Sequence, residues 1–210
     1  MAKSLNPKCK QCRRAGEKLF LKGERCISAK CAILKRNYPP GIHGSKGSRY
    51  TTSFGAQLKE KQKAKRYYGI LERQFRNYYV KTIKKKGNTA ELLLQALEMR
   101  FDNVVYKLGI SKSRNQSRQL INHGIFLVNG KSVNIPSYQI KAKDLITIKP
   151  QYQDLKIFQS FKEKKGEDEE IPSWISFDQK KLEAKILNRP SLNDIKSIFN
   201  PTLIVEFYSK

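Results

Sequence analysis

The four cysteines of the sequence all lie within its first 31 residues, as Cys9-x2-Cys12-x13-Cys26-x4-Cys31. Thiolates at such spacings can close a tetrahedral zinc site, with the first pair on a tight knuckle. We predict one structural Zn²⁺ here, because the surrounding segment is too small to form a core of its own. Such a site has no open position for catalysis. Four unligated thiols, or two disulfides in an oxidising compartment, are the alternatives.

The charge of the chain is the second feature that points to chemistry. The 210 residues carry a formal net charge of +25, and the sequence pI is about 10.0. Residues 1–90 hold 24 Lys and Arg against 4 Asp and Glu, whereas residues 91–210 hold 19 against 14. A basic arm on a more ordinary globular part is typical of proteins that bind nucleic acid.

Residues 53–80 have the pattern of a basic helix with a break at Gly69. Its cations could reach phosphate groups, and its tyrosines could stack on unpaired bases or pack in the core. The alternative is a solvated charged helix, which the lack of balancing acidic residues disfavours. The expected RNA contacts in this region are Lys59, Lys61, Lys63, Lys65, Arg66, Arg73 and Arg76.

A compact module is predicted next along the chain. Residues 90–108 should form a helix capped by Asn88, and Ser113 should open a second helix with Gln116 three residues on. The Asn129-Gly130 pair predicts a hairpin, because both turn positions need positive φ. A third strand is expected over residues 144–148, which would complete a small sheet.

One face of this module should bind RNA. Arg114 and Arg118, at i and i+4, share one side of the second helix, next to its N-terminus and Lys112. Polar donors that could add to this face are Asn103, Lys107, Gln116 and Gln119. Such a surface suits the shape and backbone of RNA. We expect Arg114→Ala combined with Arg118→Ala to weaken RNA binding without unfolding the module.

Several strings are specific in combination: RFDNVVYKLG at 100–109, SRNQSRQL at 113–120, HG at 123–124, VNGK at 128–131 and NIPSY at 134–138. They resemble the RNA-binding module of small-subunit ribosomal protein four, bacterial type. The resemblance continues through PKCKQCRR at 7–14, LFLKGERC at 19–26, YPPGIHG at 38–44, QLKEKQK at 57–63, QFRNYY at 74–79, IPSW at 171–174 and LIVEFYSK at 203–210. It therefore covers nearly the whole chain.

The resemblance implies a zinc-binding member of the universal small-subunit protein four family. Members bind 16S-type rRNA directly and help nucleate assembly of the small subunit. The matched motifs imply further rRNA contacts for Arg13, Arg14, Arg100, Ser113, His123 and Lys131. They also imply that Lys46 and Arg49 lie along the channel through which mRNA enters. Members contact small-subunit protein five, at an interface that influences decoding accuracy.

Other classes of protein carry a similar module. Pseudouridine synthases need a separate catalytic domain, for which no room remains here, and a stand-alone RNA chaperone would lack the cysteine-bearing arm. His43 and His123 have no partner set typical of a catalytic triad. We therefore predict a protein that is not an enzyme, with no catalytic residue and no small-molecule substrate. Steep salt dependence of rRNA binding, about 10³–10⁵-fold between 50 and 200 mM, is expected.

The expected fold class is α+β, in four regions. Residues 1–45 form the zinc-binding arm, 46–90 the basic helical region, 91–150 the RNA-binding module of two helices and a short antiparallel sheet, and 151–210 a C-terminal region that returns to the helical part. Residues 203–208 should close it as a strand, and the acidic stretch 162–170 should be a loop. With no secretory signal and no apolar run near ~20 residues, we expect no membrane partner and a small ribosomal subunit in the cytoplasm, or in an organelle of bacterial descent.

Overall fold

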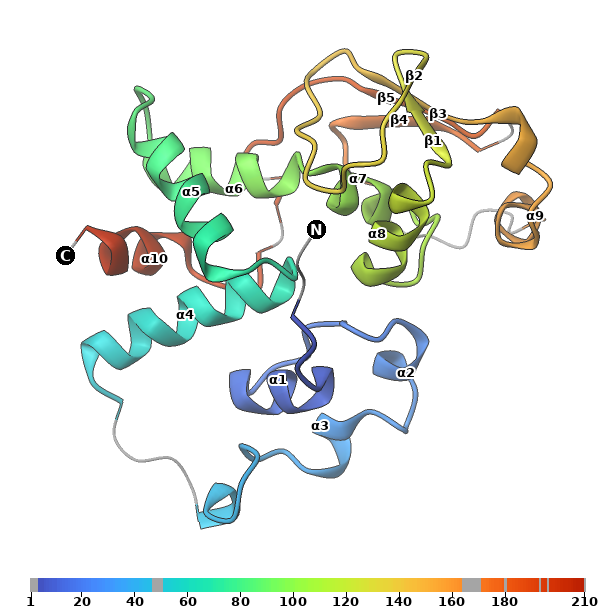
Figure 1. The fold of residues 1–210 in the computed structure, drawn as a ribbon. Coiled ribbons are helices and arrows are strands. Elements are labelled where there is room, and N and C mark those ends of the chain that lie inside the picture. Colours follow the sequence, from blue (N-terminus) through green and yellow to red (C-terminus); the bar gives the residue numbers. More distant parts are fainter. Residues whose placement is uncertain are drawn as a thin grey trace. The chain divides into compact units, whose positions relative to one another are not determined.

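The computed structural model describes residues 4–46, 51–163, 171–179, 181–192, 194–195 and 197–209. It divides into two compact units (Figure 1). The first unit combines residues 1–94 with 196–210, and the second spans 95–195. The C-terminal residues thus belong to the first unit, although the whole second unit separates them from it in the sequence.

The first unit is helical. Its elements are α1 (Lys8–Ala15), α2 (Glu24–Ile27), α3 (Ala32–Lys35), the 3-10 turn η1 (Gly44–Lys46), α4 (Ser53–Tyr67), α5 (Glu72–Ile83) and α10 (Pro201–Tyr208). α6 (Thr89–Glu98) leads into the second unit, and Asn88 accepts a hydrogen bond from the backbone of Ala90 as expected for a cap. The basic helix with a break at Gly69 is confirmed, because Gly69 has a φ of +66° between α4 and α5.

The C-terminal string 203–208 is a helix, and the predicted strand is wrong. Pro201 occupies the first turn of α10, and the side chain of Asn200 accepts a hydrogen bond from the backbone of Thr202. These start signals outweigh the β propensity of the residues that follow. Figure 1 shows α10 beside α4 and α5, where Tyr208 stacks on Phe75 and Tyr79.

A charged cluster fixes α10 against the two basic helices. The Glu72 carboxylate accepts hydrogen bonds from Lys61 Nζ at 2.9 Å, Lys65 Nζ at 3.0 Å and the Tyr208 hydroxyl at 2.7 Å. Lys61 Nζ also lies 4.4 Å from the centre of the Phe207 ring. Lys61 and Lys65 of α4 therefore form ion pairs within the protein.

Acid is expected to weaken this cluster. Burial raises the pKa of Glu72, but the hydrogen bonds from Tyr208, Lys61 and Lys65 outweigh burial and lower that pKa from 4.5 to about 2. The stabilisation is therefore complete above pH 4.5 and is lost as the pH falls toward 2. Glu72→Gln should flatten this part of the pH dependence of the unfolding free energy, measured by urea denaturation. The effect is modest, because 44% of the side chain is exposed. An unchanged pH profile in the variant would contradict this assignment.

The second unit is an α+β module. Its helices are α7 (Phe101–Lys107), α8 (Arg114–Asn122), the 3-10 turn η2 (Pro150–Tyr152) and α9 (Lys156–Glu163). Its strands are β1 (Phe126–Val128), β2 (Lys131–Ser132), β3 (Leu145–Ile148), β4 (Ile175–Asp178) and β5 (Glu183–Ile186). They form one antiparallel sheet in the order β2-β1-β3-β5-β4. Phe101, Val104 and Phe126 are fully buried in its core.

The single helix predicted over residues 90–108 is two helices. Arg100 has extended backbone with ψ of 138°, and it pairs with Gln139 as in a β-bridge. The amide of Phe101 donates to the carbonyl of Tyr138 at 2.9 Å, in place of a partner one turn earlier. Pairing with residues distant in sequence therefore replaces helical hydrogen bonds and separates α6 from α7.

Other local predictions for this module hold. The Ser113 hydroxyl accepts a hydrogen bond from the Gln116 amide and caps α8, and Asn129 and Gly130 turn the hairpin with φ of 50° and 76°. The third strand is confirmed as β3, whereas β4 and β5 were not predicted and make the sheet larger than expected. The stretch 162–170 begins within α9, and its residues 164–170 lie outside the described residues. Among the helices described, none is long and apolar enough to cross a membrane.

Candidate nucleic-acid interface

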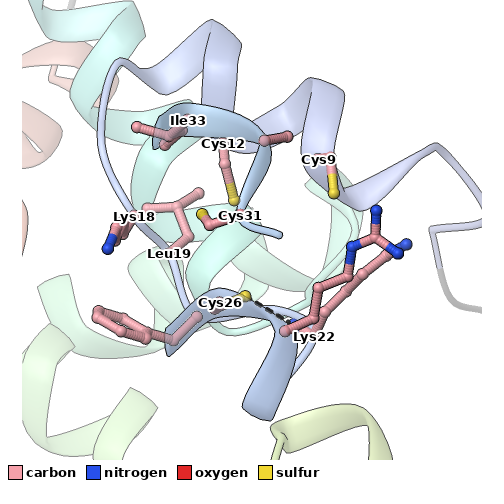
Figure 2. Close-up of a pocket in the computed structure, with 11 residues that line it drawn as sticks. Cys9, Cys12, Lys18, Leu19, Lys22, Cys26, Cys31 and Ile33 are labelled. Atoms are coloured by element: carbon pink, nitrogen blue, oxygen red, sulfur yellow. Dashed lines mark hydrogen bonds between the residues drawn. The ribbon is translucent and has the colours of Figure 1, made fainter. Parts of the chain in front are cut away.

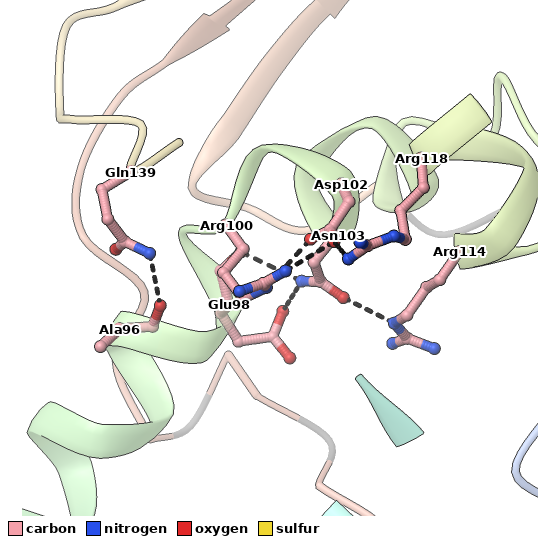
Figure 3. A network of polar contacts seen from close by, with 8 residues as sticks. All are labelled: Ala96, Glu98, Arg100, Asp102, Asn103, Arg114, Arg118 and Gln139. Carbon is pink, nitrogen blue, oxygen red and sulfur yellow. Dashed lines mark hydrogen bonds and ion pairs between the residues drawn. The ribbon is translucent and has the colours of Figure 1, made fainter. Parts of the chain in front are cut away.

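A buried ionic cluster joins α7 to α8 in the second unit (Figure 3). The Arg100 guanidinium donates to both carboxylate oxygens of Asp102, at 3.0 and 2.7 Å. Arg118 Nη1 donates to the same Asp102 Oδ2 at 3.2 Å. Arg100 is 0% exposed and Arg118 is 6% exposed. One carboxylate therefore compensates two guanidinium groups in the interior.

A second set of contacts lies beside it. The Asn103 amide donates to the Glu98 carboxylate at 2.7 Å and to the Glu98 carbonyl at 3.0 Å. Its oxygen accepts a hydrogen bond from Arg114 Nε at 2.8 Å, and the Arg114 guanidinium lies 4.4 Å from the centre of the Tyr106 ring. Figure 3 shows Asn103 between Glu98 and Arg114. Arg114 is therefore oriented by α7, with 7% of its surface exposed.

The shared face of Arg114 and Arg118 thus lies toward the protein, not toward solvent. Arg100 and Asn103, which were also predicted to contact RNA, are buried with them. The sequence-based expectation that Arg114 and Arg118 can both be removed without unfolding the module is therefore revised, because their loss breaks buried hydrogen bonds.

Other polar residues of the module remain accessible. Lys112, Gln119, His123 and Lys131 are exposed, whereas Lys107, Ser113 and Gln116 are half-buried. Ser113 and Gln116 cap the helix, since the Gln116 side chain also accepts a hydrogen bond from the Lys112 amide at 2.9 Å. His123 is the C-terminal cap residue of α8. Lys112, at the N-terminal end of α8, therefore presents the accessible charge there.

The basic residues of the first unit divide in the same way. Lys61 and Lys63 are buried and ion-paired, and Lys65 is paired with Glu72. Lys63 Nζ contacts Glu60 at 2.8 Å and Glu17 at 3.0 Å. The exposed members of the predicted set are Arg14, Lys46, Lys59, Arg73 and Arg76, with Arg13 and Arg66 half-buried. Arg49 lies outside the described residues.

The pKa of Arg66 is lowered by its surroundings. Burial lowers the pKa of its guanidinium, and the nearby Arg14 lowers it further, whereas Cys12 acts in the opposite direction. Arg66 of α4 therefore lies within electrostatic reach of the cysteine-bearing helix α1. Arg66 could therefore offset negative charge near the cysteines as well as bind a phosphate group.

The four cysteines line one pocket of the first unit (Figure 2). Cys9 and Cys12 lie on α1, Cys26 lies on α2, and Cys31 directly precedes α3. The predicted tight knuckle at the first pair is wrong, because both residues lie on one helix, whose i and i+3 positions share a face. The thiols are free of disulfides.

The environment of the thiols has two polar features. Cys26 Sγ accepts a hydrogen bond from the Lys22 amide at 3.3 Å. Burial raises the pKa of the Cys12 thiol, a backbone hydrogen bond from Leu19 acts against this, and proximity to Cys26, Cys9 and Cys31 raises the pKa further. Within the ranges that the structure describes, no three His, Cys, Asp or Glu side chains are already arranged to hold a metal ion. The pocket thus brings together four sulfur atoms that could bind zinc, but they are not arranged around a common metal position.

Sequence reasoning missed the acidic partners of these sites. Asp102 and Glu98 organise the arginines of the second unit, and Glu72 and Glu17 pair with the lysines of α4. The sequence did contain one signal, because residues 1–90 hold only four carboxylates among 24 cations. In the structure, three of these four carboxylates pair with lysines of α4.

Comparison with known proteins gives two adjoining family matches. The model of the ribosomal protein S4/S9 N-terminal domain matches residues 3–98, and that of the S4 domain matches residues 99–146. The chain is 50% identical to the small ribosomal subunit protein uS4A of Clostridium botulinum and 49% identical to uS4 of Acetivibrio thermocellus, over 210 residues and the full length of each. It is 47% identical to uS4 of Nitrosospira multiformis over 211 residues, again with full coverage.

Proposed function

The chain belongs to the ribosomal protein S4 family, and from this premise we propose that its exposed cations, not its buried arginines, contact the rRNA. It is a structural component of the small ribosomal subunit that binds rRNA, and it is not an enzyme.

The contrast along α8 carries this proposal. Arg114 and Arg118 are committed to Asn103 and Asp102, whereas Lys112 and Gln119 of the same region are exposed. A phosphate group can approach an exposed ammonium without the cost of breaking a buried ion pair. The expected rRNA contacts in this unit are therefore Lys112, Gln119, His123 and Lys131, with Lys107 at the margin.

In the first unit, the cations expected to contact rRNA are likewise those that are exposed and not in the ion pairs of α4. Lys61 and Lys63 stabilise the unit through Glu72, Glu17 and Glu60, so their charges are partly neutralised before RNA arrives. The expected phosphate contacts are Arg14, Lys59, Arg73 and Arg76, which are all exposed. Because several exposed cations would contact phosphates, rRNA binding is still expected to depend strongly on salt concentration.

We also propose that Cys9, Cys12, Cys26 and Cys31 hold one structural Zn²⁺. Support comes from the pocket that all four line, from the backbone donor to Cys26, and from Lys18, Lys22 and Arg25 at the pocket wall. Backbone donors and nearby cations offset the double negative charge that four thiolates would give a zinc centre. A bound metal would supply a cross-link between α1, α2 and the start of α3.

The resemblance to the family suggests three further roles, which we propose for this chain. Lys46 would contact mRNA where it enters the subunit, since it is exposed at the end of η1. The protein would contact small-subunit protein five and so influence decoding accuracy. It would also bind 16S-type rRNA early and help nucleate subunit assembly.

Binding of a 16S-type rRNA 5′-domain transcript at several salt concentrations tests the proposed interface. Lys112→Gln should weaken binding and reduce the slope of log K against log salt by about 0.7–0.9, as expected for one lost phosphate contact. Gln119→Ala serves as the matched control, because it removes a neutral donor and should leave the slope unchanged. An unaltered slope in Lys112→Gln would remove this lysine from the interface.

A further inference from the structure

Arg13 lies on α1 directly after Cys12, and its side chain contacts a segment 25 residues further along the chain. Its Nε donates to the carbonyl of Tyr38 at 2.9 Å, and its Nη2 donates to the carbonyl of Pro39 at 3.3 Å. The guanidinium also lies 4.7 Å from the centre of the Tyr38 ring. Arg13 therefore contacts both the backbone and the Tyr38 ring at the start of the segment 38–46.

The segment itself is compact but has little apolar anchoring. Gly44 packs so closely on Pro39 that a Cβ atom there would overlap the Pro39 carbonyl. The Gly44 amide donates to the Gly41 carbonyl at 3.1 Å, and the Lys46 amide donates to that of His43 at 3.2 Å. Ile42, in contrast, is 92% exposed. Fixing the two carbonyls at one end of such a folded-back loop also fixes the position of Lys46 at the other end.

We infer that Arg13 is a positioning residue, which holds the segment 38–46 on α1 and thereby sets where Lys46 is presented. This rests on the proposed function only for the statement that Lys46 then meets RNA. Two carbonyls accept hydrogen bonds from the donor fork of Arg13, so the side chain is oriented toward the protein and not toward a phosphate. A lysine lacks the planar fork by which two nitrogens of Arg13 donate to separate carbonyls while the guanidinium lies on the Tyr38 ring.

Hydrogen exchange of the full-length chain, free of RNA, tests the inference. Arg13→Gln should raise exchange at the Gly44 and Lys46 amides by about tenfold or more, because two hydrogen bonds from a charged donor are lost. Arg14→Gln is the matched control: it removes the same charge from the next, exposed position of α1 and should change these amides by less than about twofold.

The inference is overturned if both glutamine variants exchange alike at Gly44 and Lys46. Arg13→Lys covers the case in which Arg13→Gln disturbs the fold: it keeps the charge, and it should still exchange faster than the parent. Full protection in Arg13→Lys would show that charge alone holds the loop, which also contradicts the inference. Binding of a single-stranded RNA oligonucleotide to Lys46→Gln is a separate measurement, and unchanged binding there would overturn only the proposed RNA contact of Lys46.

Discussion

Asp102→Asn is expected to lower the free energy of unfolding of the second unit by about 3–5 kcal/mol. The substitution preserves the shape of the side chain but removes a negative charge that both Arg100 and Arg118 contact. Arg100 is fully buried, so its guanidinium could not regain hydration without unfolding. Chemical denaturation followed by circular dichroism measures the loss.

Lys112→Ala provides the control for this experiment. Lys112 is exposed just before the same helix, and its removal should change stability by no more than about 0.5 kcal/mol. An Asp102→Asn variant as stable as Lys112→Ala would contradict the structural role of the cluster. Arg114→Ala combined with Arg118→Ala should resemble Asp102→Asn, so that weaker rRNA binding by that variant reports lost folding rather than lost contacts.

Removal of zinc is expected to have the second large effect. The pure protein should carry one equivalent of Zn²⁺, and Cys12→Ser or a chelator should release it and unfold residues 4–46. The helices there have only eight, four and four residues, which are too short to persist without a cross-link. Structural zinc in comparable small sites contributes about 10–16 kcal/mol at pH 7.

Native mass spectrometry counts the metal, and hydrogen exchange over residues 4–46 reports the folding of the arm. Ala29→Ser is a suitable control, since it adds a hydroxyl at an exposed position between Cys26 and Cys31 without touching a thiol. Protein that contains no zinc and yet has a well-protected arm would show that the four thiols need no metal. Equal zinc content in Cys12→Ser and the parent would exclude Cys12 as a ligand.

The parts of the fold that the sequence predicts correctly depend on neighbouring residues. Gly69 separates two helices and Asn129-Gly130 turns a hairpin through backbone preferences of single positions, and Ser113 caps a helix through its side chain. The strand predicted over residues 203–208 overlooked local start signals at Asn200 and Pro201, whereas other errors occur where distant residues decide. Arg100 leaves the helix because the backbone at Gln139 pairs with it, and such pairing leaves no local signal.

The orientation of the arginines in the second unit was also not predictable from neighbouring residues alone. The spacing of Arg114 and Arg118 places them on one face of α8, but it does not say whether that face lies outward or inward. Asp102 decides this, 16 residues before Arg118 in the sequence, by accepting its hydrogen bond. Lys63 is similar, because its partner Glu17 lies 46 residues away. Arg118 and Lys63, both expected at the surface, are thus found in the interior, where each pairs with a carboxylate that is distant in the sequence.

The most direct test of the account is a cryo-EM map of the small ribosomal subunit that contains this chain. We predict that the Lys112 ammonium lies within hydrogen-bonding distance of an rRNA phosphate, while Arg118 remains paired with Asp102 and Arg114 with Asn103. A map in which Arg114 and Arg118 have left these partners and contact rRNA phosphates, with Lys112 free in solvent, would contradict the account.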